Sequence, residues 1–275
     1  MGTSTPWRSI TAVLASAAST SCMWIGDSWI PPNGEILTVS QIQKIHGDRD
    51  TLVMGDSLAR RFTSTLALVL KNRGGKDLSN TAVDNKHLLG KGGHGAYSYA
   101  IPKLDGNGTR LLDFRWAPLA RDVARVAEQL RKQPHSTYSL LIVCIGIHDA
   151  EVGLSLPGPM RSIKEILRDT QAALAALAAA WGGNQHPTVV WRTTPYRDGN
   201  HHDATEINQR TNQMNMDVLR NHPAGVHVSN AAMHINPKSQ GVEREGGDTP
   251  EHFNNIIRWV EIQCITHKLK RSRHE

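Results

Sequence analysis

The stretch TLVMGDSLARRF, residues 51–62, passes from a strand pattern to a helix pattern within a few residues. Residues 51–54 are apolar and suit a buried strand, and the residues after Ser57 begin a helical pattern. Gly55 permits a tight turn, and Asp56 can accept hydrogen bonds from the loop. The stretch therefore predicts a strand, a tight turn and a helix. It places Ser57 at the carboxyl end of the strand, beside the free amide groups and positive end of the helix.

Strand and helix patterns alternate over most of the chain. The apolar, β-type runs lie at residues 51–54, 110–116, 138–146, 188–194 and 225–229. Helical patterns follow at residues 58–72, 119–132, 160–181, 205–220 and 250–269. This order predicts an α/β fold with a central parallel sheet that is covered by helices on both faces. In such a sheet, sites form beyond the carboxyl ends of the strands.

Two segments rich in glycine, histidine and asparagine are expected to form loops, residues 89–107 and 194–205. Loops of this length in a compact domain are often functional. The second loop contains residue types that can bind zinc: His201, His202, Asp203 and Glu206. Adjacent histidines on a loop diverge in direction, so no metal site is expected there. No dinucleotide or P-loop fingerprint is present, and no cofactor is expected.

The tripeptide Gly-Asp-Ser also occurs earlier, in CMWIGDSWIPPNG, residues 22–34. There the consecutive prolines are not expected to begin a helix, and Asn33-Gly34 indicates a turn. Ser28 of this copy is therefore assigned a packing role, and Ser57 is the candidate nucleophile. Local sequence alone leaves Ser57 two roles, nucleophile or helix N-cap.

A serine hydroxyl is a weak nucleophile unless a base takes its proton. Of the 14 histidines, His252 is the candidate base, because it follows the last predicted strand and starts the last predicted helix at the same edge as Ser57. Asp248, four residues earlier, can hold the imidazole through its other nitrogen. The segment DTPE, residues 248–251, also matches a helix start with Asp248 as N-cap. The two roles of Asp248 are compatible.

Polar and aromatic residues near other strand ends have two possible roles each. Arg192 ends the predicted strand VVWR, where it is a candidate for binding a substrate oxygen or for pairing with a loop carboxylate. Trp116 and Trp191 are candidates for stacking on a sugar ring, but tryptophan near strand ends is at least as often part of the core.

Five motifs in order resemble those of the SGNH (GDSL-type) hydrolase superfamily: VMGDSLARRF, LLDFRWAPLARD, LLIVCIGIHDA, VVWRTTPYRD and GGDTPEHFNNIIRWVEIQ. The resemblance extends to its PC-esterase branch, which includes the plant trichome-birefringence-like polysaccharide O-acetyltransferases, and covers about residues 22–269. It implies a flavodoxin-like three-layer α/β/α sandwich. It also implies a catalytic triad of Ser57, His252 and Asp248.

The same resemblance implies an oxyanion hole. Its donors would be the backbone N–H of Ser57, a glycine of the loop at residues 90–95, represented by Gly92, and the segment with Gly146 and His148. Two features depart from the superfamily pattern. Most members have asparagine where His148 stands, and the usual separation of the aspartate and the histidine is three residues rather than four.

The resemblance implies a serine-dependent esterase or acyltransferase that acts on O-acyl groups, principally acetyl esters of a carbohydrate. Hydrolysis and transfer to a sugar hydroxyl differ in how the site excludes water, which the sequence leaves open. The two departures motivate the alternative of a catalytically inactive protein of the same fold that binds glycans or a protein partner. The expected partner is a small-molecule or polysaccharide acyl ester.

Composition argues against two other kinds of partner. The chain of 275 residues carries a formal charge of +6, but its basic residues are scattered and concentrate only at residues 267–275. Nucleic-acid binding is not expected without a basic stripe or a known module. No apolar run approaches the roughly 20 residues of a membrane-spanning helix, so stable membrane insertion is not expected.

A single catalytic domain is expected over residues 22–269. It is preceded by residues 1–21, which form either a disordered start or a weak signal segment, and followed by a basic tail at residues 270–275. The sequence leaves open a secreted or a cytoplasmic location.

The three cysteines divide into two kinds. Cys144 lies in an apolar run and is expected to be buried. Cys22 and Cys264 can pair if the protein is secreted.

Overall fold

The structure is a computed structural model that describes residues 22–25, 28–71, 95–132, 138–179, 187–197, 203–234 and 255–271. Among these residues, six strands form the main sheet: β3 (Thr51–Gly55), β4 (Tyr97–Pro102), β5 (Thr109–Trp116), β6 (Leu140–Cys144), β7 (Thr188–Arg192) and β8 (Val226–Ser229). Two further strands, β1 (Met23–Ile25) and β2 (Ser28–Ile30), pair antiparallel outside it.

The described helices are α2 (Val39–His46), α3 (Ser57–Lys71), α4 (Ala120–Arg131), α5 (Ile147–Glu151), α6 (Ile163–Ala179), α7 (Ala204–Asn221) and α8 (Asn255–Arg271). Two short 3₁₀ helices, η1 (Pro32–Gly34) and η3 (Ala232–His234), complete the set that the described residues form. None of the described helices is long and apolar enough to cross a membrane.

The strand order is β4-β5-β3-β6-β7-β8. Only β4 runs antiparallel to its neighbour among these strands; β5, β3, β6, β7 and β8 are parallel. When the five parallel strands are numbered in chain order, their order across the sheet is 2-1-3-4-5, as in flavodoxin-like folds. The predicted α/β fold with a central parallel sheet is therefore confirmed.

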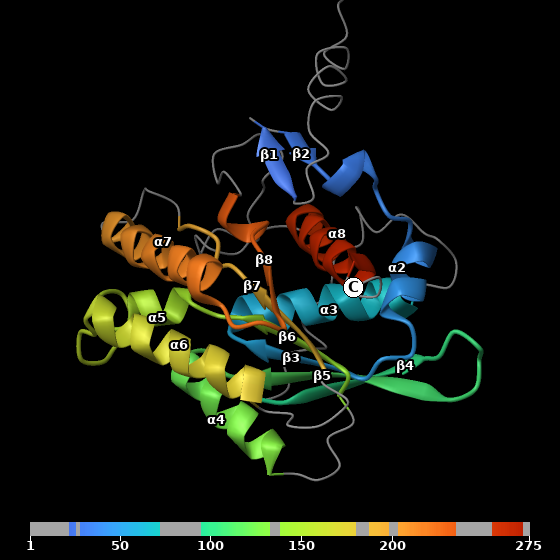
Figure 1. Ribbon diagram of the computed structural model, residues 1–275, viewed down its shortest axis with the longest axis horizontal. Coiled ribbons are helices and arrows are strands. Elements are labelled where there is room, and N and C mark those ends of the chain that lie inside the picture. The colour runs from blue at the N-terminus through green and yellow to red at the C-terminus, as the bar shows by residue number, and fades with distance from the viewer. Residues whose placement is uncertain are drawn as a thin grey trace, which may run out of the picture.

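Alternate residues of the buried strands face opposite helical layers. Leu52, Met54 and Leu141 belong to a core with α4 and α6, whereas Val53 and Ile142 belong to a core with α2, α3 and α8. Figure 1 shows α3 and α8 on one side of the sheet and α4 and α6 on the other. Because side chains of a strand alternate between faces, continuous apolar runs are what a sheet covered on both faces requires.

The prediction of a loop over residues 89–107 was wrong for part of its length. Residues 97–102 form β4, which pairs with β5 through a turn, while residues 89–94 lie outside the described residues. Tyr97, Tyr99 and Ile101 all pack toward one core. This spacing of two is a strand signal that the surrounding glycines obscured.

The first Gly-Asp-Ser segment also differs from expectation in one respect. Ser28 begins β2, and the following prolines lead into the one-turn helix η1, with Pro32 as its first residue. The expectation that these prolines would not begin a helix was wrong, because proline lacks only an N–H that the first turn does not use.

A disulfide joins Cys22 to Cys264 of α8, with the Cα atoms 5.9 Å apart, which confirms the possible pairing. Cys144 is buried and unpaired, as expected. Helix α8 continues to Arg271, so the first residues of the predicted tail at 270–275 are helical, and Lys270 contacts Glu35 at 2.8 Å. Residues 1–21 and 272–275 lie outside the described residues.

Candidate active site at the carboxyl edge of the sheet

The direction of the chain across the sheet reverses between the neighbouring strands β3 and β6. After β3, the chain forms β4 and β5 on one side of β3, and it then crosses back to form β6 on the other side. Gly55, at the end of β3, pairs with Cys144, at the end of β6, and the amide of Asp56 donates to the Cys144 carbonyl at 3.4 Å. In flavodoxin-like sheets the crevice at this reversal of direction is where ligands bind. Ser57 follows Asp56 directly in the chain.

Ser57 is the first residue of α3 and is half-buried. The capping oxygen of this helix comes from Asp56, whose Oδ1 accepts the amide hydrogens of Leu58 at 2.8 Å and Ala59 at 3.4 Å. These are the second and third helical residues, the donors that an N-cap side chain serves. The helix N-cap is therefore Asp56, and the alternative role of Ser57 as the cap is excluded.

Gly55 is required where β3 turns into α3. Its φ is +154°, and a Cβ there would lie 1.9 Å from the Cys144 carbonyl oxygen and 2.6 Å from the Ala59 Cβ. One is a backbone atom and the other a Cβ, so neither can move away as the end of a flexible side chain can. Because only glycine fits, the turn holds Asp56 and Ser57 close to the end of β6.

Shortly after β6, Gly146 stands at the N-cap position of α5 with φ +129°. A Cβ there would lie 2.0 Å from the Met214 Cε and 2.4 Å from the Thr194 Oγ1. Gly146 is thus packed against α7 and the end of β7 by necessity. This close fit fixes the start of α5, which carries His148.

His148 is half-buried, and its ring meets the ring of Trp116 edge-on, with centroids 6.1 Å apart and planes at 73°. Trp116 pairs with Gly55 on the β5 side of β3, whereas His148 follows β6 on the other side. The imidazole also interacts electrostatically with Asp56, the residue before Ser57. Its role in an oxyanion hole stays a prediction.

Asp149, the residue after His148, links α5 to its neighbours, and the sequence analysis did not identify it. Asp149 is fully buried, accepts the Ala120 amide hydrogen on Oδ2 at 2.7 Å, and pairs through Oδ1 with Arg161. Burial raises the pKa of Asp149 to about 6, while the Ala120 amide and Arg161 oppose the rise. Its position in the motif GIHDA, one residue from a candidate, was the signal available.

Arg192 is buried and paired with a carboxylate, so its assignment as a substrate-binding residue is corrected. It is 3% exposed, and its Nε and Nη2 lie 2.9 and 2.7 Å from the Glu261 Oε1 of α8. The buried carboxylate, acting against desolvation, raises the pKa of Arg192. The structural role is the one observed, with a helix carboxylate as partner instead of a loop carboxylate.

Asp248, His252 and Gly92 lie outside the described residues, so their roles stay predictions. Helix α8 begins three residues after His252. Its residue Glu261 binds Arg192, the last residue of β7, so the first turns of α8 lie near the carboxyl edge.

The two tryptophans differ in burial. Trp191 is 1% exposed and belongs to the core with α4 and α6. Trp116 is half-buried, packs against the core with α2, α3 and α8, and meets the His148 ring. A stacking role for Trp116 stays a prediction.

The residues considered for zinc do not converge where they are described. Glu206 binds Arg210 at 2.7 Å, and Asp203 stands at the N-cap position of α7. His201 and His202 lie outside the described residues. The described part of the chain contains no group of three or more histidine, cysteine, aspartate or glutamate residues arranged to hold a metal ion.

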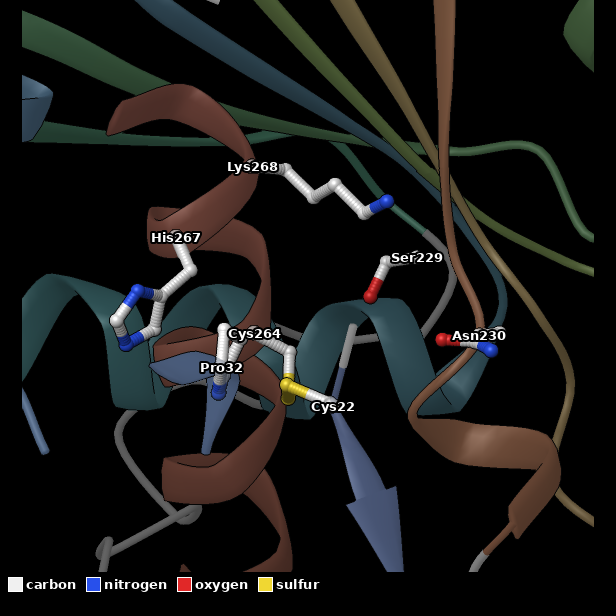
Figure 2. Close-up of a pocket in the computed structure, with 7 residues that line it drawn as sticks. All are labelled: Cys22, Pro32, Ser229, Asn230, Cys264, His267 and Lys268. Atoms are coloured by element: carbon white, nitrogen blue, oxygen red, sulfur yellow. A yellow bond between two sulfur atoms is a disulfide. The ribbon is translucent and has the colours of Figure 1, made fainter. Parts of the chain in front are cut away.

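A small hollow lies beside the disulfide. Figure 2 shows its lining: Cys22, Pro32, Ser229, Asn230, Cys264, His267 and Lys268. Its volume of about 10 Å³ has room for roughly one water molecule. It is too small for a sugar ring.

Solved structures that are similar to this chain were found by comparison. A carbohydrate esterase family 3 protein from Talaromyces cellulolyticus is 14% identical, with a TM-score of 0.46 over 82% of this chain and 97% of that one. A carbohydrate acetylesterase from Sinorhizobium meliloti is 12% identical (TM-score 0.43; 82% and 99%), and a lipase/acylhydrolase from Enterococcus faecalis is 13% identical (TM-score 0.45; 81% and 96%). No protein family and no curated protein matches the sequence. The chemistry of the site is therefore argued from its residues.

Proposed function

We propose that the protein is a serine esterase of the SGNH type, with Ser57 as its nucleophile. The observation that carries the proposal is the place of Ser57, half-buried on the turn between β3 and α3 at the crevice, with the capping role taken by Asp56. A hydroxyl at a helix N-terminus lies where negative charge is stabilised. The proposal is supported by His148, which follows β6 and meets Trp116, the residue paired with Gly55.

In the proposed reaction, the Ser57 Oγ attacks the acyl carbonyl carbon while its proton passes to His252, which Asp248 orients. The backbone N–H of Ser57, a glycine N–H from residues 90–95 and the side chain of His148 would hold the oxyanion. When the ester C–O bond breaks, His252 returns the proton to the leaving alcohol. Water then attacks the acyl-enzyme, with His252 again as base, and releases the acid and free Ser57.

The proposed substrate is an O-acetyl group on a carbohydrate. The acetyl group comes from the sequence motifs that resemble those of polysaccharide O-acetyltransferases. Trp116, half-buried beside His148, offers an aromatic surface on which a sugar ring can stack. If a sugar hydroxyl replaces water in the second step, the same site performs acetyl transfer.

Turnover of p-nitrophenyl acetate tests the proposal. Wild-type protein should release p-nitrophenol, and Ser57→Ala should fall to the background rate. Ser28→Ala is the matched control, because it removes the serine of the other Gly-Asp-Ser, and it should retain wild-type turnover. His148→Ala should lower kcat by about 10²- to 10³-fold, the usual effect of losing one oxyanion donor.

Equal turnover by Ser57→Ala and wild type would reject Ser57 as the nucleophile. No turnover by the wild type, together with glycan binding that Ser57→Ala leaves unchanged, would instead support an inactive binding protein.

A further inference from the structure

A buried carboxyl group beside Ser57 has one oxygen that the fold does not use. Asp56 is fully buried, and its Oδ1 serves the amides of Leu58 and Ala59. Its Oδ2 is also buried and has no hydrogen-bond partner in the part of the chain that the structure describes. An unsatisfied buried oxygen costs free energy, so a working site normally supplies it with a partner.

Two side chains that can carry positive charge, those of His148 and Arg192, interact electrostatically with Asp56. Arg192 is committed elsewhere, because two of its nitrogens bind Glu261. His148 is therefore the group on this edge with the chemistry to meet the unused oxygen.

The position of the His148 ring supports this assignment. Neighbouring strands lie about 4.8 Å apart, so the ends of β5 and β6 lie about 10 Å apart on either side of β3. The rings of Trp116, from β5, and His148, after β6, nevertheless approach to 6.1 Å between centroids. The end of β3 lies between these two strands, and Asp56 follows Gly55 there.

We infer that Asp56 is a positioning residue for His148: in the working site, its Oδ2 pairs with one ring nitrogen, so that the other ring nitrogen presents an N–H to the oxyanion beside Ser57. The inference rests on the proposed function and adds a residue to it. Asparagine, which most of the superfamily has at this position, carries amide hydrogens in every state. Neutral histidine has a single N–H on either nitrogen, so it needs a partner that fixes which one.

The pair works wherever the shared proton resides. With two protons between them, either Asp56 donates to the near ring nitrogen or the near ring nitrogen donates to Asp56, and the far nitrogen keeps its own proton in both cases. Burial raises the pKa of Asp56, which suits a proton shared in this way.

Two substitutions separate this role from helix capping. Asp56→Ser keeps a capping oxygen and removes Oδ2. With p-nitrophenyl acetate, it should lower kcat by about 10- to 100-fold and leave KM unchanged, a smaller loss than that of a whole oxyanion donor. Asp56→Asn keeps the cap and places an amide N–H₂ at Oδ2, which can donate to the near ring nitrogen, so it should recover most of the lost kcat.

The matched background is His148→Asn, whose amide needs no such partner. There, adding Asp56→Ser should lower kcat by less than about threefold, so the two positions are coupled in a double-mutant cycle. Equal losses from Asp56→Ser in both backgrounds, in a wild type that does turn over the ester, would overturn the inference and leave the proposed function standing.

The ¹⁵N resonances of the His148 ring test the pairing without any activity. Both Asp56→Ser and Asp56→Asn should shift the near ring nitrogen, and Asp56→Asn should move it toward the unprotonated acceptor form. Should the wild type lack turnover, the proposed function fails, and these spectra alone decide the pairing. Resonances that neither substitution changes would overturn it.

Discussion

At the residue scale, the site depends on Gly55, whose lack of a Cβ lets the ends of β3 and β6 approach closely. The carbonyl of Gly55 accepts the Ala117 amide at 2.9 Å, and its Cα faces the Cys144 carbonyl with no room for a side chain. This contact holds the end of β3 between β5 and β6. Any residue with a Cβ must push the backbone of β6 away, and Ser57 moves with the turn.

Gly55→Ala therefore tests how much the turn constrains the fold. Gly225→Ala is the matched control, because Gly225 also has a positive φ, +86°, but faces open space. The control should cost about 1–3 kcal/mol of unfolding free energy from backbone strain alone. Gly55→Ala should cost clearly more in urea unfolding, since it adds the clash. A cost no greater than that of Gly225→Ala would contradict this account.

At the same scale, the sequence predicted the turn at Gly55 and the helix start near Ser57 well, because a strand, a turn and a helix are local features. It left the cap unassigned, because Asp56 and Ser57 are both good caps and the helix start shifts the role by one residue. The partner of Arg192 was not predictable, because Glu261 lies 69 residues away. An arginine at a strand end indicates a substrate-binding site only when it is not already paired with a carboxylate from a distant part of the chain.

At the scale of elements, the Arg192–Glu261 ion pair joins β7 to α8, the helix that follows the candidate base. Both side chains are 3% exposed. Burial raises the cost of leaving either charge alone, so this pair fixes how α8 lies on the sheet.

Arg192→Ala should destabilise the protein by about 3–5 kcal/mol, because it leaves the Glu261 carboxylate buried without its partner. Arg125→Ala is the control, because it removes an exposed ion pair with Asp122, in which the arginine is 68% exposed. That change should cost less than about 1 kcal/mol. Chemical denaturation measures both, and similar small losses would show that the buried pair is not required for stability.

The elements themselves were predictable in proportion to their length and apolar content. The strands β3, β6 and β7 appear in the sequence as apolar runs because they are covered on both faces, whereas β5 alternates between buried and more exposed residues. Helix α5 has only five residues, and α2 has eight, so neither shows a clear helical period. Thr38 and Gln41 form a capping box at the start of α2, which is the signal that marks it.

At the scale of the whole molecule, the N-terminal segment clamps the last turns of α8. The Glu35 carbonyl lies 2.9 Å from the His267 Nε2, and the Leu37 backbone exchanges two hydrogen bonds with the Gln263 amide at 2.9 and 2.7 Å. The Cys22–Cys264 disulfide links the same two parts of the chain, 242 residues apart. Contacts of this range do not show as a local sequence pattern.

This clamp should weaken in mild acid. Burial lowers the pKa of His267 from its usual 6.5, against the opposing effect of Glu35. The unfolded chain then takes up a proton that the folded state resists, so stability present above about pH 6.5 is lost as the pH falls below it.

His267→Gln removes that titration. The unfolding free energy of the wild type should fall more steeply from about pH 7.5 to about pH 5.5 than that of His267→Gln. A slope in His267→Gln equal to that of the wild type would contradict the assignment.

The nucleophile itself can be located with a serine-directed fluorophosphonate, followed by mass spectrometry of the peptides. The account predicts one label, on the peptide that contains Ser57, retained in Ser28→Ala and lost in Ser57→Ala. Labelling at Ser28, or ester turnover by a protein in which Ser57 stays unlabelled, would contradict it.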